Sequence, residues 1–318
     1  MVVDRRGVLD RVSAAQDGLV TRGQALRAGY RRHEIDWLVD AGRWRAVERA
    51  VYRIDGTPVH ELSRRCRVRA ALMSLGPCAH AVLGTAAEIH GMAGLPATGE
   101  IHLALPGQAA RTRRQLPGCP GLVVHQFAHP PGSVVRVDGM AVTTPLVTLA
   151  ETIRQVPRYP AVSLLDSALN RRLVTEEELL AIPPLIAGRR GAVAARGYLT
   201  EADRRAQSPL ETRTRLRCVD GRVPPDALQL EVRDDDGYLL GLGDLGWRAQ
   251  RVIAEADGRG PHGTPEAAYA DRRRQNRIVN AGWTVLRFTW QDTLRPDYVP
   301  WTVRQALSAA AASRRSWR

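Results

Sequence analysis

The sequence has 318 residues, 44 % of them hydrophobic, and a formal net charge of +13. This length and apolar content suit two or three folded domains and argue against a disordered chain. No apolar run approaches the roughly 20 residues that a membrane-spanning helix needs. The opening MVVDRRGVLDRV has acids and arginines where a signal peptide would be apolar. We therefore expect a cytoplasmic protein without a membrane partner, and the oligomeric state stays open.

The positive charge is carried by arginine alone, because the sequence contains no lysine. Guanidinium groups bind phosphates through paired hydrogen bonds, so the charge balance favours DNA as the partner. The alternative is a solvated basic surface in a chain whose composition replaces lysine with arginine throughout. The positive balance therefore supports a nucleic-acid partner more strongly than the choice of arginine does.

The cysteines form no C-x-x-C pair, which is typical of free thiols in a reducing compartment. Cys78 with His80, and Cys119 with His125 or His129, suggest a zinc site as the alternative, but their spacing is poor for zinc ligands. We therefore expect these side chains to be structural.

The first sixty residues contain three helical patterns and a two-stranded ribbon. Apolar residues recur at helical spacing over residues 8–15, Thr21 caps a helix to about Ala28, and residues 31–41 form a third helix. The ribbon is GRWRAVERAVYRID. This order predicts a winged helix-turn-helix, which places one helix in the DNA major groove.

In that arrangement the expected DNA contacts lie at two places. Arg31, Arg32 and His33 open the recognition helix, and Arg43 and Arg45 lie at the wing. The alternative is that this small unit contacts another protein or braces a neighbouring domain.

The middle of the chain has a mixed α/β pattern without a catalytic cluster. Helices are expected over residues 61–75 and 79–90. The strand-like runs EIHLALP and GLVVHQF follow, then MAVTTPLVTLAETI. Residues 161–182 are helical again, with Thr175 as a cap, and a connecting helix leads to the last part. We divide the chain into domains at residues 1–58, 59–200 and 201–318.

Several of these patterns together resemble the AbiEi family of antitoxin and regulator proteins. They are VLDRV, GLVTRGQALRAG, WRAVERAVYRI, TTPLVTLAE and LLDSAL. The resemblance implies a DNA-binding winged-helix head and a partner protein from a toxin–antitoxin or defence locus. Val147 departs from the pattern, because relatives usually carry arginine there.

Three carboxylates in the last third are expected to converge. A helix capped by Ser208 is followed by the strand LQLEVRD and the strands LLGLGDLGW and RVIAEADG. If the turn between the last two centres between residues 249 and 250, Asp244 and Glu255 lie opposite each other, and Asp257 shares their face. The alternative is a register slip of one residue, which would separate them.

Converging carboxylates repel one another unless a cation neutralises them, and Mg²⁺ (or Mn²⁺) prefers such oxygen ligands. We therefore expect Asp244 and Glu255 to bind this cofactor and support hydrolysis of a phosphodiester. The alternative is that these acids are simply solvated at strand ends.

The order helix, three strands, helix, strand, with the motifs SPLETR, GDLGW, AEADG, DRRRQN and GWTVLRFTW, resembles the PD-(D/E)XK nuclease core. The likeness is to domains related to very-short-patch-repair endonucleases and covers about a hundred residues. It implies the following site residues: Asp244 and Glu255 as metal ligands, Asp257 and Glu211 as supporting acids, His262 as a proton-transfer group, and Arg272, Arg273 and Arg287 as phosphate-binding or carboxylate-anchoring groups. The usual final lysine of the motif is missing, and Ala256 stands where a larger apolar residue is usual.

The sequence thus predicts an α/β multidomain protein with a winged helix-turn-helix head, a mixed α/β middle and a PD-(D/E)XK-type nuclease-like domain. The expected function is Mg²⁺-dependent cleavage or nicking of DNA in repair, defence or a toxin–antitoxin setting. The alternatives are a transcriptional regulator or antitoxin with an inactive nuclease-like domain, and a protein-interaction adaptor.

Overall fold

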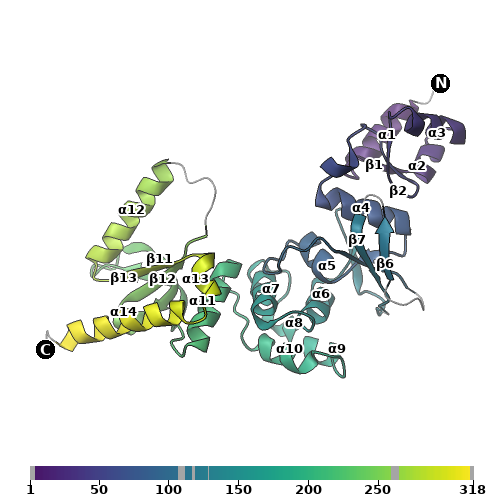
Figure 1. Cartoon of the computed structure of the whole chain (residues 1–318). Helices are drawn as coiled ribbons and strands as arrows, with labels where there is room; N and C mark the ends of the chain where they lie inside the picture. The colour runs from purple at the N-terminus through teal and green to yellow at the C-terminus, as the bar shows by residue number, and fades with distance from the viewer. Residues whose placement is uncertain (1–3, 107–111, 117–118, 128, 259–264, 316–318) are drawn as a thin grey trace. The chain divides into compact units, whose positions relative to one another are not determined.

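The computed structural model describes residues 4–106, 112–116, 119–127, 129–258 and 265–315. Its chain folds into two compact units, one of Met1–Gly91 with Pro96–Thr152 and the other of Met92–Leu95 with Ile153–Arg318. The fold is mixed α/β with several small sheets (Figure 1). None of the helices in the described ranges combines the length and the apolar character needed to cross a membrane.

The first unit begins with short helices around a small antiparallel sheet of order β1-β3-β2. The elements are α1 (Arg5–Ala14), β1 (Leu19–Thr21), α2 (Arg22–Arg27), α3 (Arg32–Asp40), β2 (Arg45–Glu48) and β3 (Val51–Arg53). Thr21 caps α2 in a capping box with Gln24, as predicted. Ile35 and Trp44 are almost fully buried and anchor the helices on the sheet. The predicted helices and ribbon are confirmed, and β1 is a strand that the sequence analysis missed.

The same unit continues with a sheet of order β6-β7-β5-β4-β9-β8 and helices packed on it. The elements are η1 (Val59–Glu61), α4 (Arg64–Leu75), β4 (His80–Ala81), α5 (Leu83–Ile89), β5 (Ile101–Ala104), β6 (Thr112–Leu116), β7 (Cys119–His125), β8 (Val134–Val137), β9 (Met140–Thr143) and α6 (Pro145–Thr152). The helix predicted over residues 79–90 is present as α5, but it begins only at Leu83, because His80–Ala81 pairs with β5 and β9.

The second unit opens with helices α7 (Arg158–Asn170), α8 (Glu176–Leu179), α9 (Ile182–Leu185) and α10 (Ala192–Leu199). Thr175 caps α8 in a capping box, as predicted. The buried Asp166 of α7 joins this region to the next helix, because it accepts a hydrogen bond from Thr212 and pairs with Arg215 at 2.8 Å. The predicted last domain lies within this unit, and the division into three domains stays a prediction.

The rest of the second unit is a sheet of order β10-β11-β12-β13 between helices. The elements are α11 (Pro209–Asp220), β10 (Ala227–Arg233), β11 (Leu239–Trp247), η2 (Arg248–Gln250), β12 (Val252–Ala256), α12 (Pro265–Asn280), β13 (Thr284–Phe288), α13 (Trp290–Leu294) and α14 (Tyr298–Arg315). Figure 1 shows α11 and α14 on one side of the sheet and α12 on the other. The predicted order helix, three strands, helix, strand is confirmed.

Each face of this sheet has its own core, because side chains alternate along a strand. Val252 and Ala254 pack with Val303 of α14, and Ile253 packs with Ile278 of α12. Glu255 continues the alternation and therefore belongs to the α12 face. The alternation along β12 thus directs the Glu255 carboxylate toward α12, the helix that carries a run of arginines.

Candidate functional site

The register between β11 and β12 decides whether the predicted acids meet. The paired residues are Leu245 with Ala254, Gly246 with Ile253 and Trp247 with Val252. This is the predicted register, and it places Asp244 opposite Glu255 directly beyond the last pair.

Two glycines beside Asp244 allow the strands to pack this closely. A Cβ atom on Gly243 would lie 2.7 Å from the Cβ of Ile253, and one on Gly246 would lie 2.3 Å from the Cδ2 of Leu230. Both distances are far below van der Waals contact, so any side chain at either position would force the backbone or its neighbours to move. The strand that carries Asp244 therefore depends on the absence of side chains at Gly243 and Gly246, which precede and follow Asp244 in the sequence.

Asp244 is held by two donors in a partly buried position. Its Oδ2 atom accepts a hydrogen bond from the backbone N–H of Ala256 at 2.8 Å, and its Oδ1 accepts one from Nε2 of Gln229 at 3.3 Å. Burial raises the pKa of the Asp244 carboxyl, and the nearby charge of Glu255 adds to the rise. A cation beside this carboxylate would offset both costs.

Glu211 is linked to Asp244 through a third residue, Gln229. Its Oε2 atom accepts hydrogen bonds from the backbone N–H of Gln207 and from Nε2 of Gln229, each at 2.9 Å. Burial raises the pKa of the Glu211 carboxyl, and the charge of Asp244 contributes to the rise. The side-chain amide of Gln229 therefore bridges Glu211 and Asp244.

Gln229 is a residue that the sequence analysis missed. Its backbone φ is +51°, in the left-handed region that a non-glycine residue rarely adopts within a strand. The paired residues on either side, Leu228 with Leu245 and Leu230 with Gly243, keep their register across it. Leu228 and Leu230 belong to the cores on opposite faces of the sheet, so the side-chain alternation of β10 shifts at Gln229. The Gln229 side chain contacts both acids.

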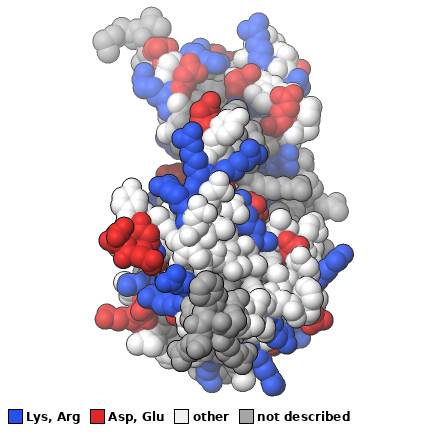
Figure 2. Space-filling view, turned by 90° about the vertical axis from the view of Figure 1, so that its left-hand side faces the viewer, with Lys and Arg blue, Asp and Glu red and all other residues white. Residues whose placement is uncertain are grey.

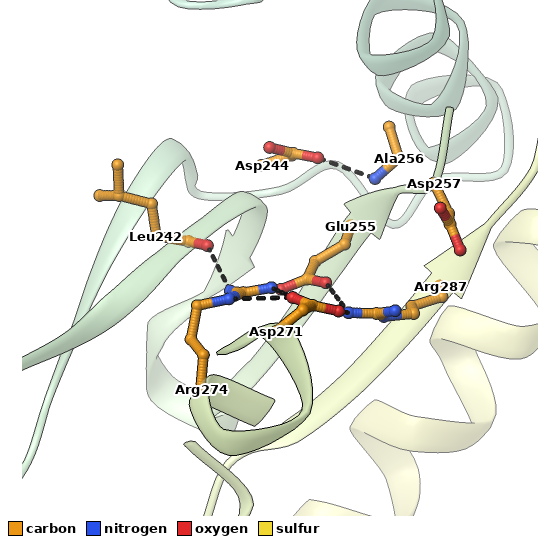
Figure 3. A pocket seen from close by; sticks show the side chains of 8 residues that line it. All are labelled: Leu242, Asp244, Glu255, Ala256, Asp257, Asp271, Arg274 and Arg287. Carbon is orange, nitrogen blue, oxygen red and sulfur yellow. Dashed lines mark hydrogen bonds and ion pairs between the residues drawn. The ribbon is translucent and has the colours of Figure 1, made fainter. Parts of the chain in front are cut away.

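A cavity of about 350 Å³ opens on the α12 face of the sheet. The residues that line it are Leu242, Asp244, Glu255, Ala256, Asp257, Asp271, Arg274 and Arg287 (Figure 3). Three predicted carboxylates, those of Asp244, Glu255 and Asp257, therefore share one cavity. Glu211 is not among the lining residues.

Two arginines neutralise Glu255 inside this cavity. Arg274 of α12 approaches its Oε1 at 2.8 Å, and Arg287 of β13 approaches its Oε2 at 3.1 Å. Figure 3 shows the carboxylate between the two guanidinium groups. Arg287 was predicted at the site and is the strand partner of Glu255. Arg274 was not predicted.

Asp271 completes this group and was also missed. It pairs with Arg274 at 2.8 Å and with Arg287 at 2.5 Å. Hydrogen bonds from Arg287 and Arg274 lower the pKa of the Asp271 carboxyl. The spacing of three residues between Asp271 and Arg274 on one helix was the sequence signal that could have found the pair.

The predicted Arg272 and Arg273 lie between Asp271 and Arg274 on α12, and both are exposed. The Arg272 guanidinium lies 6.0 Å from the centre of the Tyr269 ring. His262, the predicted proton-transfer group, lies outside the described residues. The phase of the helix therefore selects Arg274, rather than its two neighbours, for the cavity.

The donor set suits a hard divalent cation. The cavity lining has four carboxylates and two guanidinium groups, which leaves two negative charges in a chain of net charge +13. One divalent cation would neutralise them. Within the described ranges no three His, Cys, Asp or Glu side chains are grouped to hold a metal ion by themselves. Mg²⁺ is commonly held by one or two carboxylates together with water and substrate phosphates, so Asp244 and Glu255 fit it.

The predicted DNA contacts of the first unit are all exposed. Arg31 precedes α3, Arg32 and His33 form its first turn, and Arg43 and Arg45 flank the buried Trp44 at the start of β2. The Arg43 guanidinium lies 5.4 Å from the ring centre of Trp37, whose side chain is 57 % exposed on α3. The cations at α3 and at the ribbon therefore lie outside the core and are open to solvent.

Histidines of the middle region pair with one another. His80 Nε2 lies 2.9 Å from His129 Nδ1, whose other nitrogen lies 3.0 Å from Glu151, and His102 Nδ1 lies 3.0 Å from His125 Nε2. Burial lowers the pKa of His80. These contacts stabilise the sheet, and the Cys78 thiol nearby is exposed.

Comparison with known proteins begins with this middle region. Residues 79–201 match the AbiEi antitoxin C-terminal domain. The match covers β4 to the end of α10 and agrees with the predicted resemblance over this part of the chain. This part of the chain is thus similar to the C-terminal domain of AbiEi antitoxins.

Two relatives from Mycobacterium tuberculosis match beyond that domain. They are "Uncharacterized protein MT2308" of strain CDC 1551 / Oshkosh and "Uncharacterized protein Rv2248" of strain ATCC 25618 / H37Rv. Each is 33 % identical over 229 residues, which is 72 % of this chain and 81 % of the relative. The chain belongs to the same family as these two proteins.

Proposed function

We propose that this protein binds DNA through its N-terminal helices and cleaves or nicks a phosphodiester with a divalent cation in its C-terminal region. The observation that carries the proposal is the acidic cavity, in which Asp244 and Glu255 lie together in an otherwise strongly basic chain. The order of elements around it supports a PD-(D/E)XK-type architecture.

In this proposal Asp244 and Glu255 hold Mg²⁺ or Mn²⁺. When bound, such a cation polarises a phosphoryl oxygen and makes water a better nucleophile toward phosphorus. The chain's own groups do the remaining work. Gln229 fixes the orientation of Asp244, and the Ala256 N–H ties that carboxylate to the end of β12. Asp257 adds negative charge at the mouth, and His262 remains the predicted proton-transfer group.

The N-terminal part supports the DNA-binding half of the proposal. Its order of helices and ribbon is that of a winged helix-turn-helix, with α3 as the recognition helix. Arg31, Arg32 and His33 would contact bases or phosphates, and Arg43 and Arg45 would contact the backbone from the wing. Figure 2 shows arginines recurring over the drawn face of the molecule, interspersed with acidic side chains.

The AbiEi antitoxin domain supports a biological setting. A protein that carries such a domain would act in a toxin–antitoxin or defence locus and would have a toxin as its protein partner. The nuclease-like region would then act on foreign or damaged DNA in the same setting.

A second candidate function is a DNA-binding regulator or antitoxin whose nuclease-like region is inactive. The observation that favours it is the pair of arginines on Glu255, which already neutralise the carboxylate that the cation would need. The absence of lysine from the chain points the same way, since the usual motif ends in lysine.

Plasmid nicking in Mg²⁺ or Mn²⁺ separates the two candidates. The parent is expected to nick supercoiled DNA, and Asp244→Ala is expected to be inactive. Equal nicking by both proteins would reject the metal assignment. No nicking by the parent, together with tight and salt-sensitive DNA binding, would establish the regulator instead.

A further inference from the structure

The arginines around Glu255 are arranged unequally. Arg274 contacts Glu255 through Nη1 alone, while its Nε and Nη2 atoms bind Oδ1 of Asp271 at 3.2 and 2.8 Å. Nη1 also donates to the carbonyl of Leu242 at 3.4 Å. If Glu255 turned away, Arg274 would keep its contacts with Asp271 and the Leu242 carbonyl and would therefore still line the cavity.

Arg287 contacts Glu255 and Asp271 through a single nitrogen. Its Nη2 atom lies between Glu255 at 3.1 Å and Asp271 at 2.5 Å. The side chains of Arg274 and Arg287 are 27 % and 34 % exposed, whereas that of Glu255 is 12 % exposed. The two guanidinium groups are thus more exposed to solvent than the carboxylate that they share.

We propose that Arg274 and Arg287 form a binding site for the phosphodiester of DNA, and that Glu255 occupies this site until a divalent cation takes the carboxylate. The inference rests on the proposed function and adds the groups that bind the substrate. Asp271 is the positioning residue, because it keeps both guanidinium groups at the cavity when Glu255 turns to the cation.

Charge explains why the exchange would be favourable. A guanidinium pairs with a phosphate through two parallel hydrogen bonds, as it does with a carboxylate. A divalent cation on Glu255 repels both arginines, and a phosphate that arrives with the DNA supplies the negative charge that they lose. Cation and DNA would therefore bind cooperatively. In the free protein the ion pairs of Glu255 with Arg274 and Arg287 compete with both ligands.

The first test measures cation binding without DNA. Titration of the full-length protein with Mn²⁺, followed by electron paramagnetic resonance, gives the affinity of the parent and of Arg274→Gln. Because the variant removes a positive charge a few ångströms from the site, it is expected to bind Mn²⁺ about fivefold more tightly. Arg277→Gln is the matched control, since Arg277 is an exposed arginine on the same helix, away from the cavity lining. Its affinity should equal that of the parent.

The second test measures DNA binding in Mn²⁺ with a short duplex that carries phosphorothioate linkages, which resist hydrolysis. Arg274→Gln is expected to bind this DNA about tenfold more weakly, the order of one charge-assisted hydrogen bond. Arg274→Lys keeps the charge but not the paired hydrogen bonds. It should restore the parental Mn²⁺ affinity and still bind DNA less tightly than the parent.

The proposal thus predicts that one variant, Arg274→Gln, binds Mn²⁺ more tightly and DNA more weakly than the parent. If the parent binds Mn²⁺ and Arg274→Gln binds it no more tightly, or binds DNA as well as the parent, the inference is overturned while the cation site stands. If the parent does not bind Mn²⁺ at all, the proposed function fails, and the inference fails with it. Circular dichroism checks folding, and Arg287→Gln carries the same test if Arg274→Gln does not fold.

Discussion

The carboxylate of Asp244 accepts a hydrogen bond from the backbone N–H of Ala256 across 2.8 Å. This bond lies beyond the last paired residues of β11 and β12, so a side chain continues the ladder where the backbone pairing ends. It also fixes the end of β12, which carries the neighbouring Glu255. The position of the candidate cation site is therefore built into the sheet and does not depend on a loop.

Asp244→Asn separates the charge of this residue from its hydrogen bond. The amide oxygen can still accept from Ala256. The neutral amide costs less to bury than a carboxylate, but its nitrogen cannot accept the hydrogen bond from Gln229. These two effects oppose each other, so the melting temperature is expected to stay within about 2 °C of the parent. Mn²⁺ binding and nicking should both be abolished, nicking by at least about 100-fold. Asp244→Ala is the companion variant, and it should lose about 1 kcal/mol of stability as well. An Asp244→Asn protein that still binds Mn²⁺ would show that the cation lies elsewhere.

The raised pKa of Glu211 makes a prediction about pH. A carboxyl whose pKa is higher in the folded than in the unfolded state binds more protons when folded, so its ionisation lowers stability as pH rises through that interval. Glu211→Gln removes this cost and should melt a few degrees above the parent at neutral pH. The two proteins should converge below the ordinary value of 4.5, where the unfolded carboxyl is protonated too. Thermal melts over this pH range check the sign. A variant that is less stable than the parent at neutral pH would contradict it.

Salt dependence tests the proposed recognition helix. Removing one arginine–phosphate interaction lowers the slope of log K against log salt by about one, because fewer counterions are released. The double variant Arg31→Ala, Arg32→Ala is therefore expected to bind duplex DNA more weakly and with a slope about two units shallower. Arg11→Gln, at an exposed position on α1, is the control. An unchanged slope in the double variant would move the DNA interface away from α3.

Substitution of Trp44 tests whether the N-terminal core can be unfolded without loss of Mn²⁺ binding at the cavity. Its ring is 1 % exposed and lies 5.4 Å from Tyr30 and 5.9 Å from Tyr52, measured between ring centres. Trp44→Ala should lose about 3–5 kcal/mol of stability, enough to unfold a small head and abolish its DNA binding. Trp37→Ala, at a residue that is 57 % exposed, should cost under about 0.5 kcal/mol. We expect Mn²⁺ binding to survive in both variants, and its disappearance in Trp44→Ala would show that the parts depend on one another.

Local chemistry made much of the fold predictable. Thr21, Thr175 and Ser208 each cap a helix as their sequence context predicts, because a hydroxyl before an apolar-periodic run satisfies free backbone N–H groups. A tight connection between β11 and β12 predicts their register correctly, although the turn contains no glycine. In the structure this connection is made by η2 and by Arg251, whose backbone is left-handed.

The missed features depend on partners far away in the sequence. The two-residue strand at His80 exists because β5 and β9 lie on either side of it, and its own sequence continues a helical pattern. Gln229 reaches two acids through a backbone conformation that no propensity predicts for glutamine. The sequence predicts Arg272 and Arg273 at the site rather than Arg274, because the three arginines are consecutive and only the packing of α12 on the sheet determines which of them faces the cavity.

Gly243 and Gly246 carry no chemistry, yet their missing side chains let Ile253 and Leu230 close against the strand that presents Asp244. A survey of tolerated substitutions across the chain would therefore rank these two glycines alongside the acids of the cavity. A substitution of a cavity acid changes charge at the surface of the sheet, whereas a side chain at either glycine would push Ile253 or Leu230 out of place. The glycines should therefore persist even in relatives whose cavity acids have been replaced.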